Sequence, residues 1–428
     1  MKKSKLFLTL VLALALCLSG FAVTAFAADH AQGTPGSPAQ AVITKHLQLP
    51  KGATIPTANF TFDVVPESVD GNKGGDMPTI GTITVGYAPG MTPTVPTTTD
   101  SGNVTHIYKE SGNILAGVTG PNAWPHAGVY VYKITETEDT YTIAAADAAH
   151  EIMKYSQAAY TLTVYVKETA LGSGVYYADS IYVVRDTKDD GTAEVPNTKV
   201  NPEPGGGSGT YSGLVFTNSY VHTNGTDTPD TPDPLQPAQA ALTITKEVRG
   251  AYSSTSVDFD YTLTIIEPAF TDAPDPELPG SYKAYRINAK GDAVVGSPIT
   301  FVSGTPNTFK LRHGERLVFV NTPVGTEYAI TEAGTFGYDA VVSVTCAGGA
   351  GGTASSPDTG KAVEIENRFV GEGSGVQNLA AFVNTRADVI PTGLNLNDLP
   401  YIAMIVLALG AVAAFVVVKV RRWKLHNH

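Results

Sequence analysis

Two stretches of this chain begin with nearly the same phrase, and this repeat constrains the architecture more than any other feature. The phrase reads PAQAVITK at residues 38–45 and PAQAALTITK at residues 237–246. A short polar segment precedes each copy, ADHAQGTPGS at 28–37 and HTNGTDTPDTPDPLQ at 222–236, and the prolines of the second favour an extended linker. Because repeated openings indicate a shared plan, the sequence predicts two domains, 38–221 and 237–387.

Short segments with alternating apolar and polar residues follow in both units, separated by turns rich in Gly, Pro and Asn. Examples are GVYVYKITE (128–136) and AYTLTVYVKE (159–168) in the first unit, and FDYTLTII (259–266) and EYAITEAG (327–334) in the second. A period of two is typical of half-buried strands, and charged residues make up only 16% of the chain. We therefore predict an all-β protein with two tandem immunoglobulin-like β-sandwiches.

Both ends of the chain are apolar and predict contact with a membrane. Residues 1–27 combine a basic start, an apolar run and the tripeptide Ala25-Phe26-Ala27, as in a secretory signal peptide. Residues 399–418 are long enough for a transmembrane helix, and the basic tail 419–428 would remain in the cytoplasm. The sequence therefore places the bulk of the chain outside the cell.

Between these ends the chain is acidic and almost free of cysteine. Leaving out residues 1–27 and 394–428 removes seven of the 28 Lys and Arg and one of the 40 Asp and Glu, so 21 basic and 39 acidic residues remain, a net charge of −18. Such a surface disfavours nucleic acid and anionic lipid as partners. Without Cys17 of the signal only Cys346 is left, so a mature monomer cannot form a disulfide. The histidines show no metal-ligand spacing, and we predict no cofactor.

Each unit places three polar residues on strand faces that are otherwise apolar. The pattern is a lysine in the first strand, a glutamate in a middle strand and an asparagine in the last strand. These residues are Lys45, Glu136 and Asn218 in the first unit, and Lys246, Glu332 and Asn384 in the second. A lone buried charge is costly, so the same residue types in the same order twice indicate a shared chemical purpose.

An intramolecular cross-link is the chemistry that these residue types can perform. Away from water, a lysine amine loses its proton more readily and becomes a nucleophile. A glutamic acid in an apolar pocket can stay protonated, polarise the asparagine carboxamide and relay protons. The amine would attack the carboxamide, ammonia would leave, and an isopeptide bond would remain. The simpler interpretation is that the lysines reach solvent at strand ends and the glutamates are hydrated there.

The first unit resembles the pilin isopeptide-linkage domains of Gram-positive surface proteins. Lys45, YKITE at 132–136 and FTNSY at 216–220 carry this resemblance. The second unit is similar to a related Cna-B-like subtype through HGERLVFVNTPVGTEYAITEAG at 313–334 and FVNTR at 382–386. The resemblance implies one bond between the lysine and the asparagine of each unit, with the glutamate as the autocatalytic group.

The second unit offers two asparagines for this role. Asn384 lies in the last strand, which is the family's position for the bond. Asn367 of VEIENRF is the alternative, because alternation places it on the same face as Val363 and Ile365.

Residues 388–398, before the apolar helix, resemble a sortase cell-wall sorting signal. They contain an Ile-Pro-Thr-Gly element where the usual signal has Leu-Pro-x-Thr-Gly. The resemblance implies that a sortase cuts between Thr392 and Gly393 and joins the threonine to peptidoglycan or to a neighbouring pilin subunit. A plain stop-transfer anchor is the alternative interpretation.

We therefore expect a structural protein and not an enzyme: a cell-wall-anchored surface protein or pilin subunit. Lys167 in LTVYVKE and Lys199 in VPNTKVNP are two weak candidates for the acceptor of a bond to the next subunit. The alternative function is a singly anchored surface adhesin, whose inserts at 65–127 and 185–212 would bind a host or matrix ligand.

Overall fold

A computed structural model describes most of the chain between the two ends. It covers residues 30–426 except 75, 92–97, 100–102, 119–122, 145–149, 207–210, 225–239, 348, 350, 373–376 and 387–398. The predicted signal peptide 1–27 and the sorting-signal residues Thr392 and Gly393 lie outside this range.

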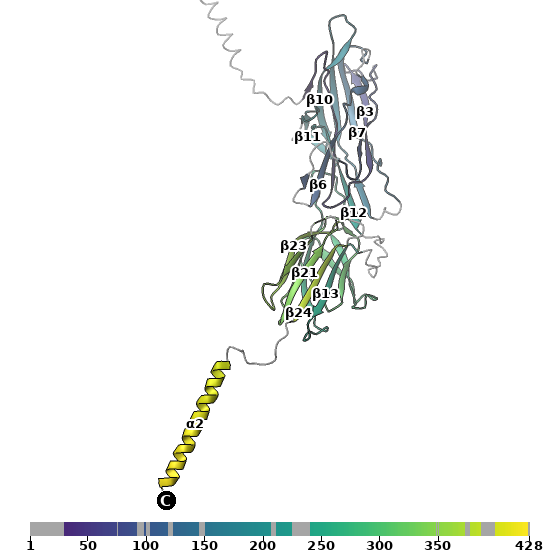
Figure 1. Ribbon diagram of the computed structural model, residues 1–428. Helices are drawn as coiled ribbons and strands as arrows, with labels where there is room; N and C mark the ends of the chain where they lie inside the picture. The colour runs from purple at the N-terminus through teal and green to yellow at the C-terminus, as the bar shows by residue number, and fades with distance from the viewer. Residues whose placement is uncertain are drawn as a thin grey trace, which may run out of the picture.

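Two β-sheets form the first domain (Figure 1). The first sheet has the order β1-β10-β9-β7-β3-β4, with β11 also paired to β10. Its strands are β1 (His30–Gln32), β3 (Ala58–Val69), β4 (Ile83–Tyr87), β7 (Gly128–Glu136), β9 (Ala159–Glu168), β10 (Tyr176–Thr187) and β11 (Ala193–Val200).

The second sheet has the order β19-β12-β2-β6-β5, with β8 also paired to β12. Its strands are β2 (Thr44–Pro50), β5 (Thr98–Thr99), β6 (Val104–Glu110), β8 (Glu151–Lys154), β12 (Val215–Asn224) and β19 (Thr322–Pro323), and a 3₁₀ turn, η1, covers Ala116–Val118.

The second domain is also a pair of sheets. One has the order β16-β15-β18-β13-β24-β21-β22 and the other β17-β14-β20-β23. Their bounds are β13 (Leu242–Arg249), β14 (Phe259–Ile266), β15 (Ser281–Ile287), β16 (Ile299–Val302), β17 (Asn307–Leu311), β18 (Arg316–Phe319), β20 (Glu327–Glu332), β21 (Tyr338–Thr345), β22 (Gly352–Ser355), β23 (Val363–Phe369) and β24 (Leu379–Arg386). The prediction of two tandem all-β sandwiches is confirmed.

Alternation along each strand supplies the two cores. In β3, Phe60 and Phe62 are fully buried between the sheets while the residues between and beside them are at least partly exposed. In β14, Phe259, Tyr261 and Leu263 do the same in the second domain. Each core therefore comes from the inward face of both of its sheets, as in other sandwiches.

In each domain the lysine-bearing strand and the last strand are parallel neighbours. β12 pairs with β2 from Val215 opposite Thr44 onward, and β24 pairs with β13 from Leu379 opposite Thr243 onward. A parallel pair needs a long crossover between its strands, and here the rest of the domain is that crossover. The two ends of each domain are thus held in one sheet.

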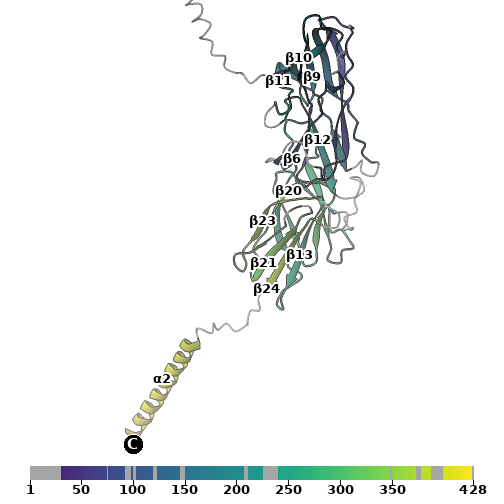
Figure 2. The ribbon, with the colours of Figure 1, turned by 45° about the horizontal axis from the view of Figure 1, so that its top comes forward.

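The two domains lie end to end and share contacts (Figure 2). β12 continues past the first domain and pairs with β19 of the second, with Thr223 opposite Pro323. Gln48 of β2 donates a hydrogen bond to the Thr271 carbonyl oxygen at 2.6 Å. Asn103 likewise donates to the carboxylate of Glu327. The end of β2 around Gln48 therefore contacts the second domain.

Three predicted boundaries differ from the structure. The segment 28–37 is not wholly a linker, because His30–Gln32 add β1 to the edge of β10. The linker predicted at 222–236 begins later, since residues 222–224 still belong to β12. The predicted transmembrane segment 399–418 is helical, but α2 runs from Leu399 to His426 and includes the basic residues. Its stretch Pro400–Arg422 is long and apolar enough to cross a membrane.

The contact between the domains at Gly325 is so close that one added methyl group should disturb it. Gly325 has φ of +79°, and a Cβ there would lie 2.6 Å from Cβ of Pro50 in the first domain. Gly325→Ala should therefore push the domains apart, in addition to the roughly 1–2 kcal/mol that a left-handed alanine costs. Small-angle X-ray scattering of residues 28–388 should show a larger radius of gyration.

Gly296→Ala is the matched control for this prediction. Gly296 has a similar φ of +76°, but no atom lies within 4 Å of a Cβ placed there. It should carry the same backbone strain and leave the scattering curve unchanged. Identical curves for the two variants would contradict the contact between the domains.

Candidate functional site

The first domain brings Lys45, Glu136 and Asn218 together between its sheets. Lys45 Nζ donates a hydrogen bond to Glu136 Oε2 at 2.8 Å, and Asn218 Nδ2 donates to Glu136 Oε1 at 2.8 Å. Lys45 and Asn218 are fully buried, and Glu136 is 8% exposed. One carboxyl group thus bridges the amine and the carboxamide. Lys45 does not reach solvent, which excludes the interpretation of it as a strand-end lysine.

The second domain repeats this arrangement with Lys246, Glu332 and Asn384. Lys246 Nζ donates to Glu332 Oε2 at 2.7 Å, and Asn384 Nδ2 donates to Glu332 Oε1. All three residues are at most 2% exposed. The Lys246 ammonium also lies 3.8 Å from the ring centroid of Phe259, which is within the range of a cation–π contact.

The backbone register that positions the two sites is the same. Lys45 lies opposite Phe216 in the parallel pair β2–β12, two residues before Asn218. Lys246 lies opposite Phe382 in β13–β24, again two residues before Asn384. Because side chains two residues apart share a strand face, lysine and asparagine point to the same side on neighbouring strands.

The glutamate reaches each pair from the facing sheet. Glu136 ends β7 opposite Phe62 of β3, and Glu332 ends β20 opposite Tyr261 of β14. Each site therefore forms only when the two sheets pack face to face. A change of register by one residue would turn every one of these side chains away.

Burial shifts the pKa values of the lysines and of Glu136 in the directions that favour their uncharged forms. Removal from water lowers the pKa of Lys45, opposed by the charge and hydrogen bond of Glu136. Burial likewise raises the pKa of Glu136 against the opposing effect of Lys45. Burial also lowers the pKa of Lys246 to about 8. Both shifts therefore increase the fraction of uncharged amine, which is the nucleophilic form.

The two sites differ in what surrounds the carboxamide oxygen. The backbone N–H of Ser156 donates to Asn218 Oδ1 at 2.7 Å. Within the described part of the chain, the buried Asn384 Oδ1 has no hydrogen-bond partner. Instead, the second site gains a hydroxyl: Tyr261 donates to Glu332 Oε2 at 2.8 Å, where the first site has the apolar Phe62.

The alternative asparagine of the second domain, Asn367, is not in the site. Its φ is +54° and its side chain is exposed, because the pairing of β23 with β20 shifts between Ile365 and Arg368. This irregularity breaks the alternation on which the alternative depended. Asn384 is the asparagine that contacts Glu332.

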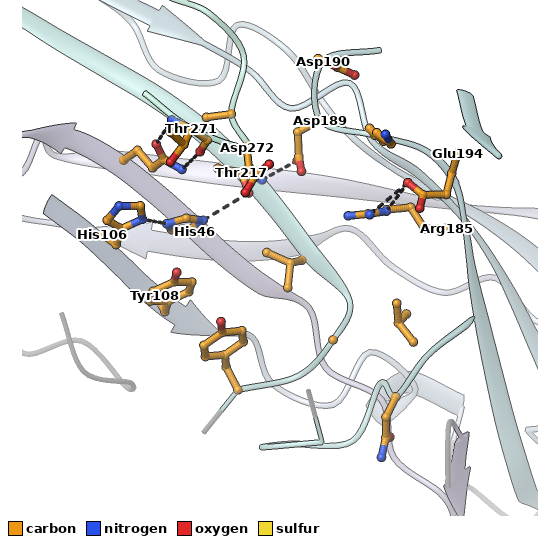
Figure 3. A pocket seen from close by; sticks show the side chains of 18 of the residues that line it. His46, His106, Tyr108, Arg185, Asp189, Asp190, Glu194, Thr217, Thr271 and Asp272 are labelled. Carbon is orange, nitrogen blue, oxygen red and sulfur yellow. Dashed lines mark hydrogen bonds and ion pairs between the residues drawn. The ribbon is translucent and has the colours of Figure 1, made fainter. Parts of the chain in front are cut away.

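The two candidate acceptor lysines lie at different surfaces. Lys167 is exposed on β9 and forms an ion pair with Asp179 at 2.8 Å. Lys199 is exposed on β11 and lines a cavity of about 930 Å³. Figure 3 shows this cavity, with the hydrogen-bonded pair His46 and His106 on the outward face of β2 and β6.

Sequence reasoning did not identify the residues that surround the lysine, glutamate and asparagine of each site, namely Tyr261, Ser156 and Asp189. Tyr261 could have been found, since alternation in FDYTLTII places its hydroxyl on an apolar face where it needs a partner. Ser156 lies shortly before β9. Asp189 accepts a hydrogen bond from the Ser156 hydroxyl and lies in the turn between β10 and β11. No periodic pattern marks residues in such turns.

Each domain is thus a sandwich whose neighbouring first and last strands carry a buried lysine and asparagine, bridged by a glutamate. Residues 41–221 match a family model described as the Spy0128-like isopeptide containing domain. This match confirms the predicted resemblance of the first domain to that family. Residues 240–369 match a second model, a domain of unknown function (DUF7601). The Cna-B-like resemblance of the second domain stays a prediction.

Similar proteins include pilins of Streptococcus pyogenes. A pilin of serotype M1 is 24% identical over 408 residues, which are 94% of this chain and 97% of that protein. The crystal structure of the S. pyogenes major pilin is 22% identical and covers 81% of this chain and 99% of that one, with a TM-score of 0.29. The major pilin T-13 is 15% identical, covers 84% and 100%, and also has a TM-score of 0.29.

The lowered pKa of Lys246 predicts how stability depends on pH when the amine stays free. Asn384→Ala removes the carboxamide, so Lys246 remains an amine. Between its folded pKa of about 8 and its ordinary 10.5, the unfolded chain binds more protons, so the free energy of unfolding rises with pH. Urea unfolding between about pH 7.5 and 9.5 should show a rise of at most about 1.4 kcal/mol per pH unit.

The double variant Lys246→Met/Asn384→Ala serves as the control. It lacks the titrating amine, so its stability should rise less with pH over the same range. Equal slopes in the two variants would contradict the lowered pKa.

Proposed function

We propose that each domain forms a Lys–Asn isopeptide bond by itself, between Lys45 and Asn218 and between Lys246 and Asn384. The observation that carries this proposal is the buried glutamate that contacts both the amine and the carboxamide in each domain. The family match of residues 41–221 supports it independently.

The chemistry follows from the contacts of the first site. A proton passes from the Lys45 ammonium to Glu136, which leaves a neutral amine and a protonated acid. The Nζ lone pair attacks Cγ of Asn218, and the carbonyl electrons move to Oδ1. Glu136 gives its proton to Nδ2 and takes one from Nζ, so ammonia leaves as the carbonyl re-forms. The amine and the carboxamide yield one amide and one ammonia, and Glu136 is again the protonated acid; it returns to the carboxylate when the departing ammonia takes that proton as ammonium.

Glu332 would have the same role in the second domain. Its Oε2 accepts from Lys246 and from Tyr261, and its Oε1 accepts from Asn384. The hydroxyl of Tyr261 would hold the carboxyl in place while protons move.

Such bonds suit a chain that bears tension. Each would join the first strand of a domain to its last, so a pull on the two ends loads a covalent bond instead of the sheet. The bonds would also close loops that run from 45 to 218 and from 246 to 384. Each closed loop lowers the conformational entropy of the unfolded chain, which would raise the free energy of unfolding by about 5 kcal/mol. We propose that the protein is a pilus or surface-stalk subunit.

We also propose that a sortase attaches this subunit. The Ile-Pro-Thr-Gly element ends five residues before α2, whose apolar stretch would hold the chain in the membrane until cleavage. The new bond would join Thr392 to a neighbouring pilin subunit or to peptidoglycan, and the protein would then lie at the cell surface.

The first prediction of the proposal concerns mass. The ectodomain, residues 28–388, should be lighter than its sequence by two molecules of ammonia, because each bond expels one. Glu136→Ala and Glu332→Ala should each restore one, since the proton relay is lost. Intact-mass spectrometry measures this directly.

Glu138→Ala is the matched control for the first site. Glu138 lies two residues beyond Glu136 and is exposed. Its replacement should leave the full deficit. A wild-type mass equal to the sequence would overturn the proposed bonds and leave the family likeness as one of fold.

The second prediction concerns the sorting signal. Thr392→Ala removes the residue at which a sortase would form its acyl intermediate, so the chain should stay in the membrane fraction of cells that express the matching sortase. Immunoblots of wall and membrane fractions should show this change, while Thr385→Ala, in β24, should be sorted normally. Normal sorting of the Thr392 variant would leave the stop-transfer interpretation.

A further inference from the structure

The carboxamide of Asn218 is held at both of its polar atoms. Its Nδ2 donates to Glu136, and its Oδ1 accepts from the backbone N–H of Ser156 at 2.7 Å. When an amine adds to Cγ, negative charge develops on Oδ1. A fixed backbone N–H aimed at that oxygen would stabilise this charge, as the donors of an oxyanion hole do.

A second buried carboxylate holds this donor in place. Oδ1 of Asp189 accepts a hydrogen bond from the Ser156 hydroxyl and another from the Thr217 N–H at 2.7 Å. Asp189 is 8% exposed, and its own carbonyl oxygen accepts from the Gln157 N–H at 3.0 Å. Asp189 thus fixes the segment that supplies the donor and the residue just before Asn218.

Figure 3 shows the hydrogen bond between Asp189 and Thr217 at the wall of the cavity. The turn between β10 and β11 therefore positions the Asp189 carboxylate beside the site. Among the described residues, Asp189 forms no hydrogen bond with the Lys45 amine or the Asn218 carboxamide. Its charge opposes the lowering of the Lys45 pKa and adds to the raising of the Glu136 pKa, and its hydrogen bonds reach the site through Ser156 and Thr217.

We propose that Asp189 is a positioning residue for the cross-link of the first domain, and that the Ser156 N–H is the oxyanion donor it positions. This inference rests on the proposed function. The second domain lacks the device, because Asn384 Oδ1 has no hydrogen-bond partner in the described part of the chain. The bond between Lys45 and Asn218 therefore forms faster than the bond between Lys246 and Asn384.

The experiment follows both bonds in the same molecules. The full chain is synthesised in a cell-free system with detergent and sampled over time. Tryptic peptides joined through Lys45–Asn218 and through Lys246–Asn384 are then quantified by mass spectrometry. Asp189→Ala should slow the first linkage roughly tenfold, since the donor stays but loses its alignment, and should leave the rate of the second unchanged.

Three further variants separate positioning from folding. Ser156→Ala keeps the backbone N–H but loses the hydroxyl bond to Asp189, so it should also slow the first linkage. Asp189→Asn keeps an oxygen that can accept both hydrogen bonds and should restore most of the rate. Asp190→Ala, at the exposed neighbouring carboxylate, should have no effect. Trypsin resistance of the first domain in the same samples reports its folding.

Each result decides the inference. Slow first linkage in folded Asp189→Ala and Ser156→Ala chains, with rescue by Asp189→Asn, supports it. Unchanged first linkage in the folded variants overturns it, even if Asp189→Ala lowers stability. If the Asp189→Ala chain does not fold, Ser156→Ala gives the answer alone. A wild-type chain with neither linkage would overturn the proposed function itself, which is a separate outcome.

Discussion

The burial of a lysine amine beside a glutamate carboxyl is the interaction on which the rest of this structure depends. Lys45 and Lys246 each lie in a core of aromatic side chains, where an unpaired charge would be very costly. The carboxyl group accepts a hydrogen bond from the amine and so makes the burial tolerable. The same low polarity favours the neutral amine, so the feature that costs stability also prepares a nucleophile.

The fold supplies the geometry that this interaction needs. In each domain the lysine-bearing strand and the last strand are parallel neighbours, and the asparagine lies two residues beyond the position opposite the lysine. The glutamate arrives from the other sheet at the end of a middle strand. The reacting groups therefore meet only after both sheets have formed and packed, which would make the bond a final step that fixes a finished fold.

Much of this could be predicted from the sequence because strand alternation has a period of two. That rule placed all six lysine, glutamate and asparagine residues of the two sites inward, and the repeated opening phrase separated two domains. It failed at Asn367, where an irregular pairing with φ above zero reverses the face. It could not find Ser156 or Asp189, whose positions depend on how turns and segments before strands pack. It also missed β1 and the end of β12, because edge pairing with a distant strand leaves no local pattern.

The central claim is that a covalent bond joins the first and last strands of each domain, and pulling on single molecules tests it most directly. The ectodomain would be stretched from its two ends by force spectroscopy. The account predicts no unfolding step from either domain before the attachment ruptures, and two steps in a Glu136→Ala/Glu332→Ala variant. Two unfolding steps in the wild-type chain, with the full contour length released, would contradict it.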